Sequence, residues 1–277
     1  MPSTVLIDWA MGQGMKSTRR RILSLGSCIL VVTSVCLSAN VHAAEVRVAV
    51  AANFTAPMAQ IAATFKKSTG HRLLISYGST GRLFAQISNG APFEVLLAAD
   101  STAPAKLEAS GLAVKGSRMT YAIGRLVLWS PLPTVVDSHA DVLRRGDYTR
   151  LAIAAPLLAP YGAAAVQTLE RLGLRAASQP KWVTGESIGQ AYSLVATGNA
   201  QLGFVAASQV FSGGKLISGS AWLVPADLHS PIRQEAVLLN RAQSNLAARA
   251  LLTYLKSDAA KAIMASFGYE APEPGRQ

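Results

Sequence analysis

The sequence predicts an α/β protein of two lobes, each a mostly parallel sheet flanked by helices. Half of the 277 residues are apolar and 15% are charged, a composition typical of globular proteins. Short apolar strands alternate with amphipathic helices, the order that produces parallel sheets. Two such series extend over roughly 230 residues, which is more than one small sheet needs, so two lobes are expected.

The first series begins at Glu45, where valines at alternate positions of residues 46–50 have the period of a strand. Pro57 then opens a helix that Gly70 ends, since proline favours the first turn of a helix and glycine its end. A strand, a helix and a strand follow at residues 73–77, 81–89 and 93–98. This order predicts a parallel sheet with helices on its faces.

The second series follows a long apolar stretch at residues 119–129. Its expected helices are residues 140–145, 162–172 and 187–197, and its expected strands are residues 150–155, 181–183 and 202–206. A strand-like segment at 236–239 and two helices at 245–256 and 259–267 close the chain. We therefore expect a first lobe of residues 44–125 with a C-terminal return at 236–277, and a second lobe of residues 126–235.

The N-terminal 43 residues are expected to be a signal peptide. Lys16 and Arg19–Arg21 precede 18 uncharged residues, and small residues before Ala44 predict cleavage there. Residues 18–23 also resemble a twin-arginine export signal, so either export route is open, as is a start at Met1 or Met15. An apolar stretch of this length is barely long enough for a membrane anchor. The expected mature protein is periplasmic, without stable membrane insertion.

Net charge favours an anionic partner. The chain carries +11, and the first 43 residues hold four of its basic residues and one acidic residue, which leaves +8 on residues 44–277. That part has no run of three basic residues, and its basic residues are not interleaved with aromatic ones, which argues against nucleic acid. Both cysteines, Cys28 and Cys36, precede residue 44, so no disulfide, thiolate metal site or cysteine nucleophile is expected.

Turns at the ends of the expected strands are the candidate binding groups. In an open parallel sheet, ligands lie beyond the carboxyl ends of the strands, against helix starts. Hydroxyl, amide or glycine residues occupy these turns at 52–55, 78–81, 159–162, 185–188 and 206–208. Such turns bind anions without a formal counter-charge. Each would also serve as an ordinary helix cap, so an anion site requires several of them to meet in one cleft.

Catalytic motifs are weak in this sequence. His71, His139 and His229 are far apart and lack the spacing of metal ligands, so no metal cation site is expected. Ser79 follows a strand and precedes a helix, but the G-x-S-x-G nucleophile motif would need glycine where Tyr77 stands. No phosphate-binding or dinucleotide-binding glycine motif is present. We expect a binding protein without a cofactor rather than an enzyme, with a serine hydrolase that uses Ser79 as an alternative.

Seven motifs follow one another in a characteristic order and spacing. They are VAANF at 50–54, YGSTG at 77–81, QISNGAP at 86–92, FEVLLAAD at 93–100, PYG at 160–162, GFV at 203–205 and FGY at 267–269. This order resembles the periplasmic molybdate-binding proteins of ABC transporters, over about residues 45–270. The resemblance implies the type II periplasmic-binding-protein fold, with the ligand in the cleft between the lobes.

The same resemblance implies a set of oxyanion ligands. The Asn53 side chain and the Thr80 hydroxyl match side-chain ligands of the family, with Ser79, one residue away, as the alternative to Thr80. Tyr161 and Ile188 match positions that donate through backbone N–H groups at helix starts. Ala206 falls where some members have a tyrosine that reaches the ligand, so this chain lacks that phenol.

The function that the resemblance implies is capture of molybdate, and of tungstate, for an ABC importer. The expected partners are the small oxyanion and the importer's membrane permease, and the expected state is a monomer. The anion would be held through its oxygens, so no residue is expected to ligate a metal cation directly. Another tetrahedral oxyanion such as sulfate is an alternative, because the same fold and donors would serve it. Arg82 is either a solvated surface residue or a cation at the rim of the cleft.

Overall fold

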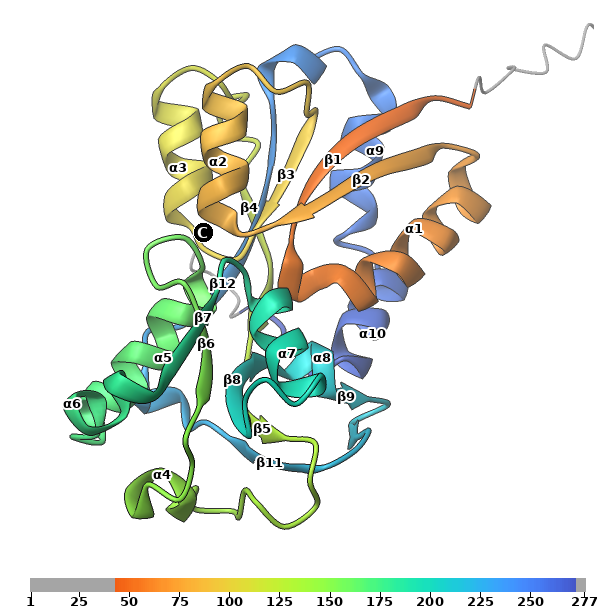
Figure 1. The fold of residues 1–277 in the computed structure, drawn as a ribbon. Helices are drawn as coiled ribbons and strands as arrows, with labels where there is room; N and C mark the ends of the chain where they lie inside the picture. The colour runs from red at the N-terminus through yellow and green to blue at the C-terminus, as the bar shows by residue number, and fades with distance from the viewer. Residues whose placement is uncertain (1–42, 273–277) are drawn as a thin grey trace, which may run out of the picture. The chain divides into compact units, whose positions relative to one another are not determined.

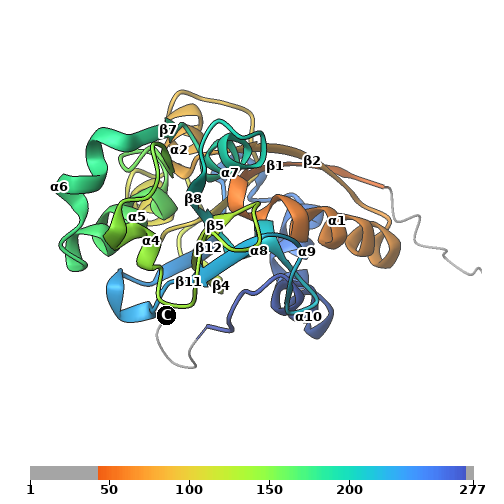
Figure 2. The same cartoon turned by 60° about the horizontal axis from the view of Figure 1, so that its bottom comes forward.

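Two five-stranded sheets form the framework, as Figures 1 and 2 show from two directions. The computed structural model describes residues 43–272. The first sheet contains β1 (Glu45–Ala51), β2 (Arg72–Gly78), β3 (Val95–Ala98), β4 (Met119–Gly124) and β12 (Ile232–Leu238). The second contains β5 (Leu126–Ser130), β6 (Leu151–Ala154), β7 (Trp182–Gly185), β8 (Leu202–Ala206) and β11 (Ser220–Leu223). A short hairpin pairs β9 (Phe211–Ser212) with β10 (Lys215–Leu216). Both sheets lie in one compact unit of the chain.

Four of the five strands in each sheet run in the same direction. In the first sheet, of order β2-β1-β3-β12-β4, β1 is parallel to β2 and β3, and β12 is antiparallel to β3 and β4. In the second, of order β11-β5-β8-β6-β7, β6 is parallel to β7 and β8, and β5 is antiparallel to β8 and β11. The expected class of two mostly parallel, helix-flanked sheets is therefore confirmed.

Helices cover both faces of the first sheet (Figure 1). One face carries α1 (Thr55–Thr69), α9 (Leu246–Tyr254) and α10 (Asp258–Ser266), and the other carries α2 (Thr80–Ser88) and α3 (Thr102–Ala109). Helix α1 buries Met58, Ile61 and Phe65, the apolar stripe of its sequence. It ends at Gly70, whose φ of 76° suits glycine and whose N–H donates to Lys66 O.

The second sheet is enclosed in the same way. Helix α5 (Pro160–Arg171) packs on one face, with α4 (Asp141–Arg145) in the same core, and α7 (Ile188–Ala196) with α8 (Ala207–Val210) on the other. The remaining short helices are α6 (Arg175–Ser178) and the 3-10 turns η1 (Ala52–Phe54), η2 (Gln179–Lys181), η3 (Ala226–Leu228) and η4 (Asn240–Ala242).

The chain crosses between the two sheets at residue 125, where the expected lobes meet, and returns a few residues earlier than the sequence expectation. The apolar stretch 119–129 is two strands, since β4 ends at Gly124 and β5 begins at Leu126 in the other sheet. The return begins at Ile232, so residues 232–235, which we had assigned to the second lobe, pair within the first sheet. Gln234 and Glu235 interrupt the apolar pattern there, which hid the first half of β12, although both residues are buried.

The predicted signal peptide lies outside the described residues, except for Ala43. Among residues 43–272, no helix has both the length and the apolar character needed to cross a membrane.

Candidate functional site

A small pocket lies where the carboxyl ends of β1, β2 and β6 meet the helix starts of both lobes. Its volume is about 10 Å³, room for about one water molecule and far below the roughly 300–1,000 Å³ of pockets for organic ligands. Its lining comprises Ala51, Ala52, Asn53, Gly78, Ser79, Thr80, Ala159, Pro160, Tyr161 and Ile188. All five residues predicted from the sequence are thus brought together, from four different turns.

Two hydroxyl groups enter the pocket from the start of α2. Thr80 is buried, and its Oγ1 accepts a hydrogen bond from Ala99 N at 3.0 Å, so its own proton is free to be donated elsewhere. Ser79 is the N-cap residue of α2, and its buried Oγ has no hydrogen-bond partner among the described residues. A buried hydroxyl without a partner is costly, which is the expected state of a ligand-binding group before its ligand arrives.

The start of α5 leaves one backbone donor available. Pro160 has no N–H, and the N–H groups of Gly162 and Ala163 both donate to Ala159 O, at 2.9 and 3.1 Å. The N–H of Tyr161 is left as the donor of this first turn, and Tyr161 lines the pocket.

The start of α7, like that of α5, adds a backbone N–H donor from the second lobe. Its N-cap residue Ser187 accepts a hydrogen bond from Gln190 N at 3.3 Å, and Ile188 follows as the first helical residue. The N–H of a first helical residue has no acceptor within its own helix. Ile188 is buried and lines the pocket, so this N–H is the second backbone donor from the second lobe.

Asn53 contributes differently from the sequence expectation, which gave its side chain to the oxyanion. Its Nδ2 donates to Gln234 Oε1 at 2.7 Å and to Tyr269 Oη at 2.8 Å, which uses both amide protons. Gln234 Nε2 donates to Ile232 O, which fixes Gln234 Oε1 as the acceptor facing Asn53. The backbone N–H of Asn53, in the turn η1 that follows β1, is left as its donor.

The pocket is lined by uncharged residues. None of its lining residues is acidic or basic, and the one titratable side chain is the Tyr161 phenol. Burial, followed by the neighbouring Tyr269, raises the pKa of Tyr161 well above its ordinary value, so this phenol stays neutral. The starts of α2, α5 and α7 each contribute a positive helix-dipole end. Within residues 43–272, no group of three His, Cys, Asp or Glu side chains is placed to hold a metal ion.

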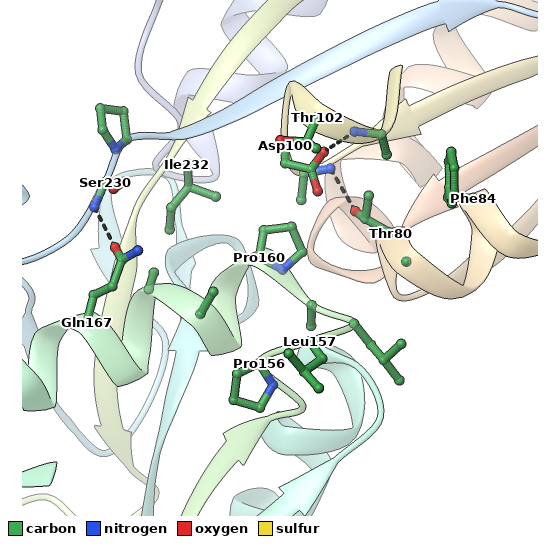
Figure 3. Close-up of a pocket in the computed structure, with 18 of the residues that line it drawn as sticks. Thr80, Phe84, Asp100, Thr102, Pro156, Leu157, Pro160, Gln167, Ser230 and Ile232 are labelled. Carbon is green, nitrogen blue, oxygen red and sulfur yellow. Dashed lines mark hydrogen bonds between the residues drawn. The ribbon is translucent and has the colours of Figure 1, made fainter. Parts of the chain in front are cut away.

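A larger cavity of about 570 Å³ adjoins the pocket and shares Thr80, Ala159 and Pro160 with it (Figure 3). Asp100 in its wall accepts a hydrogen bond from Ala103 N at 2.8 Å, and burial raises the pKa of its carboxyl. Across the cavity, Gln167 of α5 accepts from Ser230 N. The sequence did not predict this cavity, because loops 156–158 and 230–232 complete it and carry no recognisable motif.

Arg82 joins the two lobes beside the pocket. Its Nη1 lies 2.8 and 2.9 Å from the two carboxylate oxygens of Glu186, which precedes α7 in the second lobe. Next to it, Gly81 N donates to Leu158 O at 2.9 Å. Arg82 is therefore paired with Glu186 of the other lobe. Neither sequence interpretation of Arg82 included this pairing.

We expect Arg82→Gln to accelerate ligand dissociation by less than about fivefold. The two side chains of the pair are 56% and 35% exposed, and exposed pairs contribute about 0–1 kcal/mol. Stopped-flow dissociation rates at low and high salt measure the effect, with Arg145→Gln, from an exposed pair within the second lobe, as the control. A tenfold or larger increase in the dissociation rate for Arg82→Gln would show that the Arg82–Glu186 pair contributes more than an ordinary exposed ion pair.

Comparisons with known proteins agree with this geometry. Residues 46–270 match the family described as bacterial extracellular solute-binding protein. A relative named molybdate-binding protein ModA, from Azotobacter vinelandii, is 54% identical over 253 residues, which are 91% of this chain and 98% of the relative. A relative of the same name from Rhodobacter capsulatus is 50% identical over 227 residues, which are 82% of this chain and 88% of the relative.

A solved structure shows the same fold. The periplasmic molybdate-binding protein of Azotobacter vinelandii superposes with a TM-score of 0.80 at 42% identity, covering 83% of this chain and all of that one. Together with the match over residues 46–270, this shows that the chain belongs to the family of bacterial extracellular solute-binding proteins.

Proposed function

We propose that this protein binds molybdate, and tungstate, in the small pocket between its lobes, and presents the anion to the membrane permease of an ABC importer. The observation that carries the proposal is the convergence of neutral donors from both lobes on one small pocket. Relatives at 54% and 50% identity bear the name of molybdate-binding proteins. The proposed mature protein begins at Ala44 and acts as a monomer in the periplasm.

The proposed ligands are backbone N–H groups and hydroxyls. Asn53, Thr80, Tyr161 and Ile188 donate through backbone N–H groups at the start of a helix or turn, and Thr80 and Ser79 donate through their hydroxyls. Both residues line the pocket, which supports the proposal that both hydroxyls contribute rather than one of them alone. Charge-assisted hydrogen bonds and helix dipoles together can hold a dianion without a buried Lys or Arg.

A hydrolase that uses Ser79 is not favoured. A nucleophilic serine needs a general base within hydrogen-bond reach. In the described structure, Ser79 Oγ has no hydrogen-bond partner of any kind. The unpartnered hydroxyl suits an anion ligand better than a catalytic nucleophile.

Titration calorimetry with molybdate, tungstate, sulfate and phosphate tests the proposed function. Rigid backbone donors placed for a larger tetrahedral anion cannot all reach a smaller one. We therefore expect sulfate to bind at least 100-fold more weakly than molybdate, a difference of about 2.7 kcal/mol or more. Equal affinities for sulfate and molybdate would refute the assignment to molybdate.

Affinity for molybdate is expected to be nearly constant from about pH 6.5 to 9. The proposed donors do not titrate in this range, and the raised pKa of Tyr161 keeps the one titratable lining residue neutral. Asp100, whose carboxyl pKa is raised by burial, lines the neighbouring cavity and is not among the residues that line the pocket. Calorimetry in two buffers of different ionisation enthalpy checks this. A buffer-dependent heat at pH 7.5 would reveal a proton exchanged by the protein.

A further inference from the structure

A buried cluster of polar side chains lies directly behind the pocket. It comprises Asn53 from the end of β1, Gln234 from β12, Ser208 from α8 of the second lobe and Tyr269 from the C-terminal segment. All four side chains are at least nine-tenths buried. Of these four residues, Asn53 also lines the pocket. The phenol of Tyr161, another lining residue, also meets the cluster, since it hydrogen-bonds with Tyr269 and Asn53.

Tyr269 holds Asn53 at two points. Its hydroxyl accepts from Asn53 Nδ2 at 2.8 Å and donates to Asn53 O at 2.9 Å, so the phenol bridges the side chain and the main chain of one residue. The Tyr269 ring packs edge-on against Phe54, with ring centroids 5.3 Å apart. The next residue, Glu270, exchanges two backbone hydrogen bonds with Ile123 of β4, which anchors the segment that carries the phenol.

The same carbonyl of Asn53 is also tied to the second lobe. Ser208 Oγ donates to Asn53 O at 2.6 Å and lies 3.3 Å from Tyr269 Oη. One oxygen atom thus accepts hydrogen bonds from both lobes at once. Because a carbonyl has two lone pairs, these two donors satisfy it completely and restrain the peptide group between Asn53 and Phe54.

We propose that Tyr269 is a positioning residue for anion binding, which holds Asn53 so that its backbone N–H faces the pocket, while Ser208 ties the same residue to the second lobe. This inference rests on the proposed function, since it concerns how the same site holds its anion. Tyr269 itself does not line the pocket and acts through Asn53. Its loss should therefore shorten the lifetime of the complex more than it slows association, because changes in the contacts of one binding site act mostly on the dissociation rate.

The chain offers a matched control for the test variant Tyr269→Phe. Tyr121 is a second buried tyrosine in the same core, with its ring 5.0 Å from that of Phe54, and its hydroxyl has no hydrogen-bond partner among the described residues. Tyr121→Phe therefore removes the same atom from the same core without removing a hydrogen bond. A Ser208→Ala variant removes the contact from the second lobe alone.

The experiment measures molybdate association and dissociation rates for the wild type and these variants, well below each melting temperature. We expect Tyr269→Phe to raise the dissociation constant about tenfold, mainly through faster dissociation, and Tyr121→Phe to stay within twofold of the wild type. Ser208→Ala should weaken binding less than Tyr269→Phe, and the double variant should lose less than the product of the two effects, because both act on one carbonyl.

Failure of this inference can be distinguished from failure of the proposed function. An affinity of Tyr269→Phe within twofold of the wild type, with only the melting temperature lowered, would show that Tyr269 is purely structural and would overturn the inference. An equal loss in Tyr121→Phe would do the same, since it would trace the effect to the core rather than to Asn53. A wild-type protein that does not bind molybdate would refute the proposed function, and the inference with it.

Discussion

Replacing Gly162 by alanine is expected to lower both the stability of the protein and its affinity for the anion. A Cβ at this position would lie 2.1 Å from Ala154 O and 2.7 Å from Ala154 C, both backbone atoms of β6 that cannot rotate away. Helix α5 would have to move off the sheet, at a cost of about 3 kcal/mol. For a protein of this size we expect a melting temperature lower by about 6–12 °C.

The affinity should fall in the same variant because Gly162 follows Tyr161, whose N–H is a proposed ligand. Gly189→Ala is the control, since a Cβ there meets only ordinary contacts at 3.5 Å and the residue also lies at the start of a pocket helix. We expect the control to keep its melting temperature and its affinity. Thermal unfolding and calorimetry measure both quantities, and a Gly162→Ala protein as stable as the wild type would contradict the packing described here.

Ile188→Pro is expected to weaken molybdate binding about 10- to 150-fold by removing a single backbone N–H. A hydrogen bond to a charged acceptor contributes roughly 1.5–3 kcal/mol. Proline is well tolerated as the first residue of a helix, and the preceding Ser187, at φ −132° and ψ 166°, already has the extended conformation that proline requires before it. The substitution therefore removes the donor without breaking α7.

Ile188→Ala provides the comparison, because it removes more of the buried side chain than proline does but keeps the N–H. We expect Ile188→Ala to lose stability through the cavity it leaves, while its affinity stays within a fewfold of the wild type. Circular dichroism confirms that each variant is folded before its affinity is measured. If alanine weakens binding as much as proline, the side chain of Ile188 rather than its N–H supports the anion.

Local patterns predicted most of the fold. Alternating valines located β1, and Pro57 with Gly70 bounded most of α1, because strand period and helix-end chemistry are properties of short segments. The return to the first sheet was less predictable. Arg233, Gln234 and Glu235 interrupt the apolar pattern at the start of β12, and the strands that pair with this segment are far away in the chain.

The candidate site was predictable to the level of residues but not of atoms. The turns between strands and helices indicated the segments, the family resemblance singled out Thr80, Tyr161 and Ile188 within them, and all three residues line one pocket. The role of the Asn53 amide could not be predicted from the residues around it in the sequence, because its partners Gln234 and Tyr269 are 181 and 216 residues away in the chain. The burial of Gln234 would have indicated that network, because buried polar groups need partners, but the polar run 233–235 gave no sign in the sequence that Gln234 is buried.

Anomalous diffraction at the molybdenum absorption edge, from crystals grown with molybdate, would locate the anion directly. We predict one strong peak in the small pocket, with molybdate oxygens within about 3.2 Å of Tyr161 N and Ile188 N and of the Thr80 hydroxyl. The Asn53 amide should still contact Gln234 and Tyr269 rather than the anion. A peak in the larger cavity beside Lys106, or a molybdate whose oxygens are held by Lys or Arg side chains, would contradict a pocket built from neutral donors.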